Sequence, residues 1–357
     1  MKAGITDGAG KVWLEDVPVP EPDDYQCLCR NLVCATCTGT DRKHIRNQLP
    51  WKQEYPGIFG HESIGIVLET GKKVKNFRKG DMVIRPTAVY NGERYAGFTS
   101  LWGGYAEYGL VTDAAARLAD DPDAKINYYV QFQMKIPRDL ELEAGDASML
   151  ITLKEVLGYA DSVGIGLNTP VLITGLGSVG LAFCKALRLL GAYPVIAAAR
   201  RDSEFPLALE LGADFVVNTE KQDLAEAVRE ITGGRGASRL IDVTGAPGYV
   251  VRCLPALAGD GKVCPYAKYL PGDPLCNHIE PGRILEGRTG EVRTHEAICS
   301  AVRHNLLPDL HKLYSHRLPF RMLKEGFDMI ERKEAFKIVF DMAGPDGSAN
   351  SNVQEGK

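Results

Sequence analysis

The feature that most constrains the fold is a glycine-rich turn between an apolar strand and an apolar helix. The stretch Val171–Thr174 is apolar or β-branched, Gly-Leu-Gly-Ser-Val-Gly follows at 175–180, and apolar residues continue at helical spacing as far as Gly191. In this strand–turn–helix context the Gly-x-Gly-x-x-Gly pattern indicates a dinucleotide-binding unit, whereas the glycines alone would also fit a purely structural turn.

Each residue of this turn has an expected role in binding a dinucleotide. Gly175 permits the tight turn, Gly177 lets a pyrophosphate approach the backbone, and Gly180 lets the helix pack closely on the strand. Ser178 and Val179 lie where the helix begins, and the free N–H groups of a helix N-terminus attract phosphates.

Composition narrows the class of protein. The chain has 357 residues, of which 45% are hydrophobic and 25% charged, as in a soluble globular protein of two domains. A formal net charge of −4 gives no reason to expect nucleic acid or a membrane as partner.

No apolar run is long enough to span a bilayer, and the first residues predict a strand and no signal peptide. Nine scattered cysteines, an odd number, predict reduced thiols and a cytoplasmic location.

Two patterns divide the chain. Short strands with Gly and Pro between them predict a β-rich, barrel-like domain over 1–152. Strands then alternate with helices over 153–290, which is typical of a doubly wound parallel sheet and places the protein in the α/β class. We expect 291–343 to return to the first domain and the polar stretch 344–357 to form a flexible tail.

Three side chains of the first domain suggest a metal site. Cys37, His61 and Glu62 offer a thiolate, an imidazole and a carboxylate, which with water in the fourth position would make a catalytic zinc site. Such an ion polarises an alcohol or carbonyl oxygen. The alternative is that these residues only pack or cap their loops.

Several motifs together resemble those of a known family. They are Cys-x-Gly-Thr-Asp at 37–41, Gly-His-Glu at 60–62, Lys-Gly-Asp-Met-Val at 79–83, Gly-Gly-Tyr-Ala-Glu-Tyr at 103–108 and the glycine turn at 175–180. In this order the chain resembles zinc-dependent medium-chain alcohol and polyol dehydrogenases over nearly its whole length. The resemblance implies a GroES-like catalytic domain, split in sequence around a Rossmann domain, with the active site in the cleft between them.

The sequence departs from that family at the metal site. Thr38 separates Cys37 from the Gly-Thr-Asp motif, so Cys37 would need a bulged loop, and Cys34 is the reserve ligand. Ile151, which cannot bind a metal, stands where many relatives carry a further ligand. Its presence suits the ligand set of sorbitol-dehydrogenase-like members, which is Cys, His, Glu and water. Glu155 is a less favoured replacement for the missing ligand. Residues 85–102, where many members bind a structural zinc, contain no cysteine, so we expect one zinc only.

The resemblance also suggests a path for the proton. Thr40 matches the family's relay hydroxyl, and His44 could pass the proton outward with an imidazole that titrates near the working pH. An ordinary surface histidine is the alternative for His44. Asp41 could orient a ligand histidine or cap its loop.

The residues after the second strand of the alternating region bear on the choice of cofactor. An NAD enzyme carries an acid there, but this chain has Ala199 followed by Arg200 and Arg201, which would bind a 2′-phosphate. We therefore expect NADP(H) in preference to NAD(H). The alternative is that the arginines are only solvated and Asp202 binds the ribose.

Two further contacts are implied by the resemblance alone. Thr244 matches a position that lines the nicotinamide side of the cofactor site in the family. Lys337 lies near the position of a basic residue, late in the chain, that contacts the pyrophosphate in the family.

The resulting hypothesis is a zinc-dependent oxidoreductase that interconverts a secondary alcohol (a polyol, a sugar or a related small molecule) and its ketone with NADP(H). The alternatives are a zinc-free NADPH-dependent reductase of activated C=C or quinone substrates, and a catalytically silent cofactor-binding protein. The resemblance implies a homodimer or homotetramer. The long segment Asp113–Met134 could be a lid or an oligomer contact.

Overall fold

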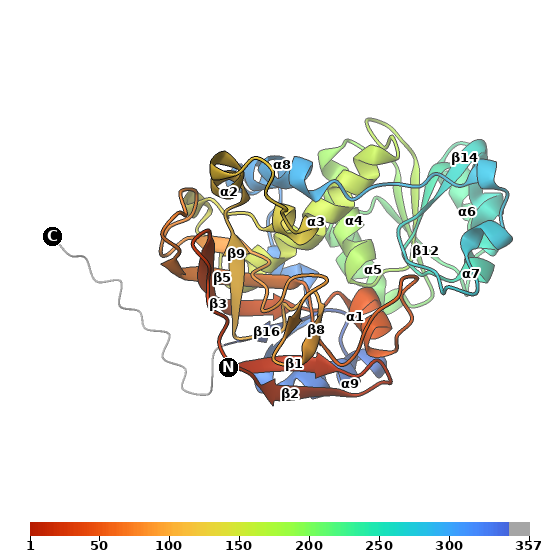
Figure 1. Cartoon of the computed structure of the whole chain (residues 1–357). Coiled ribbons are helices and arrows are strands. Elements are labelled where there is room, and N and C mark those ends of the chain that lie inside the picture. The colour runs from red at the N-terminus through yellow and green to blue at the C-terminus, as the bar shows by residue number, and fades with distance from the viewer. Residues whose placement is uncertain (343–357) are drawn as a thin grey trace. The chain divides into compact units, whose positions relative to one another are not determined.

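The computed structural model describes residues 1–342, which divide into two units (Figure 1). The first unit consists of Met1–Thr36, Tyr55–Lys135 and the chain from His316 onward, and the second of Cys37–Glu54 and Ile136–Ser315. The tail expected at 344–357 lies outside the described residues.

The first unit is rich in short strands. One sheet has the strand order β2-β1-β4-β8-β7. Its strands are β1 (Lys2–Thr6), β2 (Val12–Asp16), β4 (Gly57–Phe59), β7 (Arg94–Tyr95) and β8 (Phe98–Leu101). The unit also contains helices α2 (Ala114–Asp120) and α9 (Leu323–Glu331).

A second sheet of this unit has the order β15-β16-β3-β5-β6, with β9 also paired to β3 (Figure 1). Its strands are β3 (Gln26–Ala35), β5 (Glu62–Thr70), β6 (Met82–Ile84), β9 (Tyr108–Thr112), β15 (His316–Pro319) and β16 (Ile338–Asp341). At the end of β3, Ala35 pairs with Glu62 of β5 on one side and with Val339 of β16 on the other. Segments far apart in sequence therefore meet where β3 ends.

The second unit contains a parallel sheet of order β12-β11-β10-β13-β14. Its strands are β10 (Val171–Thr174), β11 (Val195–Ala199), β12 (Phe215–Asn218), β13 (Ala237–Asp242) and β14 (Leu257–Pro265). The helices between them are α4 (Ser178–Leu189), α5 (Phe205–Glu210), α6 (Leu224–Ile231) and α7 (Pro247–Cys253). This is the strand order of a dinucleotide-binding fold, so the predicted α/β class and doubly wound sheet are confirmed.

Three further helices belong to the second unit: α1 (Thr38–Ile45), α3 (Ala144–Ser162) and α8 (Glu291–Arg303). Helix α3 begins at Ala144, ahead of the expected domain boundary at residue 152, and the Glu143 carboxylate caps it by accepting a hydrogen bond from Gly145 N. The expected boundary at residue 152 therefore falls inside one continuous helix.

Two negative findings hold for the described residues. No helix within 1–342 is both long and apolar enough to cross a bilayer. All nine cysteines lie in this range, and none of them forms a disulfide.

The glycine turn has the geometry that its sequence predicts. Gly175 has a φ of +96°, a backbone angle that residues other than glycine rarely adopt. A Cβ placed on Gly180 would lie 2.0 Å from the carbonyl oxygen of Gly175, so only glycine lets α4 approach β10 this closely. A Cβ on Gly177 would meet nothing within 4 Å, which leaves the backbone there open to a ligand.

These glycines make a matched pair for a stability test. We expect Gly180→Ala to lower the free energy of unfolding by about 1–3 kcal/mol, because α4 must move away from the turn. Gly177→Ala, which meets no neighbour, should cost less than about 1 kcal/mol, as for a change at a helix N-cap. Urea unfolding without cofactor measures both, and equal stabilities of the two variants would contradict this packing.

Candidate metal centre and cofactor site

The end of β3 is held firmly just before the first candidate ligand. Thr36 N donates to Ile338 O at 2.8 Å, and Ile338 N donates back to Thr36 Oγ1 at 3.0 Å. Lys337 Nζ also donates to Thr36 O at 2.9 Å. Because a single peptide bond joins Thr36 to Cys37, these contacts determine where the cysteine leaves the sheet.

Cys37 is the N-cap residue of helix α1, which begins directly at Thr38. The fully buried Asp41 accepts a hydrogen bond from Cys37 N at 3.0 Å and so fixes the helix start. The intervening Thr38 is therefore accommodated by a helical turn, where we expected a bulged loop. For Asp41, the contact with Cys37 is the loop-capping role named above as an alternative.

His61 and Glu62 lie where β5 begins, and both are buried. Gly60 before them has a φ of +89°, and a Cβ there would come within 2.4 Å of the Tyr105 ring, so glycine is required at this bend. The His61 ring makes a T-shaped contact with Trp102, with ring centroids 4.5 Å apart. The imidazole is thus oriented by its neighbours.

The structure brings the three predicted ligands together. A ligand atom from each of Cys37, His61 and Glu62 lies within 4.8 Å of the other two, and no other such trio occurs among residues 1–342. Ligand atoms 2.0–2.3 Å from a tetrahedral Zn²⁺ lie roughly 3.3–3.8 Å apart, so the three side chains would have to draw closer to hold the ion. Sulfur, nitrogen and oxygen donors suit zinc. The reserve candidate Cys34 is buried within β3 and does not belong to the trio.

Glu62 forms a buried ion pair with Lys337. The Lys337 ammonium binds Glu62 Oε2, and the two side chains are only 2% and 1% exposed. A carboxylate buried this deeply needs an opposite charge. Because a carboxylate has two oxygens, Glu62 can serve Lys337 and a metal together. The structure thus gives Lys337 a role other than the pyrophosphate contact that the resemblance implied.

The two proton-relay candidates share a face of α1. Thr40 is half-buried, and His44 lies four residues later, one helical turn along. His44 is 1% exposed, and burial lowers its pKa to about 3. The expectations of a surface histidine and of titration near the working pH are therefore both wrong. Gln53 Nε2 lies 2.9 Å from His44 Nδ1; since an amide nitrogen can only donate, Nδ1 accepts and Nε2 carries the proton.

Helix α3 supplies no further ligand to the trio. Ile151 is fully buried, and Glu155 Oε2 accepts a hydrogen bond from Tyr266 at 3.2 Å. The set of one sulfur, one nitrogen and one oxygen ligand remains a prediction for these three side chains.

At the carboxyl end of β13, Asp242 organises the candidate nicotinamide side of the cofactor site. Its buried carboxylate accepts hydrogen bonds from Thr244 N at 2.9 Å, Thr244 Oγ1 at 2.6 Å and Gly245 N at 3.0 Å. Thr174 Oγ1 and Tyr269 Oη donate to it as well, at 3.1 and 2.5 Å. Our sequence reasoning missed Asp242, although an acid that ends an apolar strand was a signal for it.

The arginines after β11 are not equivalent. Arg201 Nε donates to Glu204 at 3.1 Å, so this guanidinium is already paired. Asp202 bonds to Asn218 and Lys221, which leaves it less suited to the ribose role considered above. Arg200 is exposed and forms no ion pair within the described part of the chain.

Comparison with known proteins identifies relatives over more than nine-tenths of the chain. The alcohol dehydrogenase GroES-like domain matches residues 24–121, and the zinc-binding dehydrogenase domain matches residues 178–289. L-threonine 3-dehydrogenase of Pyrococcus horikoshii is 34% identical over 344 residues, which cover 92% of this chain and 94% of that protein. The Bacillus licheniformis protein of the same name is 26% identical over 338 residues, covering 91% and 94%.

Solved structures show the same fold. A zinc-binding dehydrogenase from Sinorhizobium meliloti bound to NADP has a TM-score of 0.77 at 23% identity, and covers 95% of this chain and 98% of its own. The 2R,3R-butanediol dehydrogenase of Bacillus subtilis has a TM-score of 0.75 at 21% identity, and covers 95% and 99%. The predicted combination of a GroES-like domain with a dinucleotide-binding domain is confirmed.

The buried ion pair gives a prediction about stability. In metal-free protein, Lys337→Met should lower the free energy of unfolding by about 3–5 kcal/mol, because it removes the ammonium that pairs with the buried Glu62 carboxylate. The double variant Glu62→Gln/Lys337→Met removes both charges and should recover much of the loss. Urea unfolding in the presence of a chelator measures both. A single variant as stable as the wild type, or a double variant no better than the single one, would contradict the pairing.

Proposed function

Because the chain belongs to the zinc-dependent medium-chain dehydrogenase family, we propose that it interconverts a secondary alcohol and the matching ketone with one zinc ion and NADP(H). An alcohol dehydrogenase acting on CH–OH groups is the activity that its relatives support. The observation that carries the proposal is the trio Cys37, His61 and Glu62. A zinc-free reductase would not need a sulfur, a nitrogen and an oxygen donor close together for its chemistry.

The three side chains would hold the ion and leave a fourth position open to substrate or water. When bound there, Zn²⁺ supplies a Lewis acid for an alcohol or carbonyl oxygen. Lys337 keeps the Glu62 carboxylate in place through the buried ion pair. Asp41 keeps the Cys37 backbone in place through its hydrogen bond to Cys37 N.

Thr40 and His44 are the proposed proton path. The hydroxyl of Thr40 can take up a proton at Oγ1 and release its own, since a hydroxyl both donates and accepts. His44 has an oriented, neutral imidazole with its proton on Nε2. In this tautomer His44 passes a proton on only if Nε2 releases its proton while Nδ1, which now accepts from Gln53, takes one up.

The cofactor would occupy the glycine turn and the strand ends beside it. Gly175, Gly177 and Gly180, with the N–H groups of Ser178 and Val179, form the proposed pyrophosphate site. Thr244, held by Asp242, would contact the nicotinamide side. Arg200, exposed beside the end of β11, supports NADP(H), because a guanidinium binds a 2′-phosphate through charge-assisted hydrogen bonds.

The proposed substrate is a small secondary alcohol. Polyols and sugars fit this class, and so does L-threonine, which relatives are named for and whose 3-hydroxyl is secondary. A homodimer or homotetramer, a cytoplasmic location and the lack of a structural zinc remain predictions.

A substrate panel tests the proposal. Polyols, sugars, L-threonine and the matching ketones are assayed with NADP(H) and NAD(H), before and after removal of metal by a strong chelator. We expect turnover to be lost without metal and restored by added Zn²⁺, with about one zinc bound per chain. Cys37→Ser should lose both zinc and turnover, whereas the exposed Cys276→Ser should keep both. Undiminished turnover of metal-free protein would favour the zinc-free reductase, and binding of cofactor with no turnover at all would favour a silent protein.

The two arginines give a second test. Arg200→Ala should raise the KM for NADP⁺ about 10–100-fold, the effect of losing a charge-assisted hydrogen bond, and should leave the KM for NAD⁺ unchanged. Arg201→Ala should have a smaller effect, because that side chain is already bound to Glu204. Steady-state kinetics with both cofactors decide the point. Equal changes for NADP⁺ and NAD⁺ would contradict a 2′-phosphate contact.

A further inference from the structure

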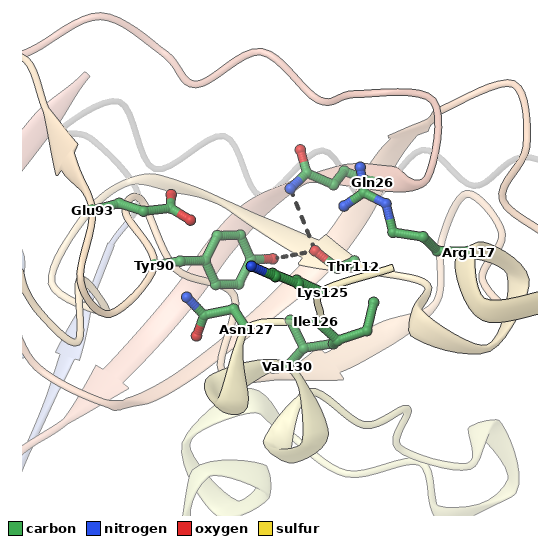
Figure 2. A pocket seen from close by; sticks show the side chains of 9 residues that line it. All are labelled: Gln26, Tyr90, Glu93, Thr112, Arg117, Lys125, Ile126, Asn127 and Val130. Atoms are coloured by element: carbon green, nitrogen blue, oxygen red, sulfur yellow. Dashed lines mark hydrogen bonds between the residues drawn. The ribbon is translucent and has the colours of Figure 1, made fainter. Parts of the chain in front are cut away.

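The long segment Asp113–Met134, which the proposed function leaves without a role, forms one wall of a cavity of about 270 Å³ in the first unit (Figure 2). Lys125 and Asn127 come from this segment, Thr112 from the end of β9, and Tyr90 and Glu93 from the chain between β6 and β7. None of the three candidate metal ligands lines it.

The floor of the cavity is polar and rigid. Tyr90 Oη lies 2.7 Å from Thr112 Oγ1 and 3.1 Å from Gln133 Oε1, and Tyr90 is almost completely buried. Gln133 Nε2 donates to Leu110 O at 2.9 Å, so the amide is fixed by the backbone of β9. Burial raises the pKa of Tyr90, which therefore offers a neutral hydroxyl. A floor built in this way exists before any ligand binds.

The rim carries charges of both signs. Arg117 is fixed by an ion pair with Asp23 at 2.9 Å and lies over the Tyr25 ring, 5.1 Å from its centroid. Lys125 and Glu93, in contrast, form no ion pair or side-chain hydrogen bond with any residue in 1–342, although both line the same cavity (Figure 2). The rim thus presents one ammonium and one carboxylate that the protein itself does not neutralise.

We propose that this cavity binds a small zwitterion of the α-amino acid class, with its carboxylate at Lys125 and its ammonium at Glu93. A simple anion would face Glu93, and a simple cation would face both Lys125 and Arg117, so a ligand with one charge is disfavoured. The volume equals that of about nine water molecules at ~30 Å³ each, enough for an amino acid with a short side chain. Thr112, Asn127 and the Tyr90 hydroxyl offer further hydrogen bonds.

Isothermal titration of the full-length protein with L-alanine tests the site, with acetate and methylammonium chloride as probes that carry one charge each. The titration is repeated on the Cys37→Ser variant in chelator, so that binding at the metal centre cannot account for the signal. We expect L-alanine to bind both proteins equally and each probe with one charge to bind at least about tenfold more weakly.

Variants of the rim locate the binding. Lys125→Met and Glu93→Gln should each weaken binding of L-alanine about tenfold, through the loss of one charge pair. Exposed residues of the same unit, changed as Lys72→Met and Glu69→Gln, are the matched controls and should leave it unchanged. All four changes are at exposed side chains, so folding should be preserved. Three results would each overturn the proposal. L-alanine does not bind at millimolar concentration, its binding is lost in Cys37→Ser, or its affinity is unchanged in the Lys125 and Glu93 variants.

Discussion

The ion pair between Glu62 and Lys337 is the interaction on which the candidate centre depends. It joins the start of β5 to the residue that precedes β16, and Lys337 also bonds to Thr36 at the end of β3. The chain that returns to the first unit after the dinucleotide-binding segment therefore supplies the ammonium that pairs with a buried candidate ligand. Two buried charges are tolerated only as a pair with good hydrogen bonds, which makes this contact a requirement of the site as well as of the sheet.

The dinucleotide-binding segment could be predicted closely because its signals are local. Each strand is a short apolar run, each helix follows within a few residues, and Gly175 and Gly180 leave little choice of turn. The three candidate ligands could also be picked out from sequence, since His61 and Glu62 adjoin a required glycine and Cys37 precedes a short helix. Here the residue types themselves limit the chemistry to a few possibilities.

The contacts that could not be predicted arise from tertiary packing. Lys337 and Glu62 are 275 residues apart, and only the lysine within the apolar run Phe336–Phe340 hinted that a buried charge needed a partner. His44 resembles a solvent-exposed relay in sequence, yet its burial and its contact with Gln53 keep it neutral. The cavity beside Tyr90 likewise depends on how the segment Asp113–Met134 folds against β9, which its composition does not encode. Tertiary packing decided each case, whether the partners lie nine residues apart, as His44 and Gln53 do, or 275.

X-ray absorption spectroscopy at the zinc edge tests the central claim most directly, because it counts the sulfur atoms around the ion. The account predicts one sulfur at about 2.3 Å, from Cys37, with nitrogen and oxygen atoms at about 2.0–2.2 Å. Two sulfurs would mean that a second cysteine such as Cys34 takes the place of Glu62. A shell without sulfur would mean that Cys37 is no ligand, and either result would contradict the account.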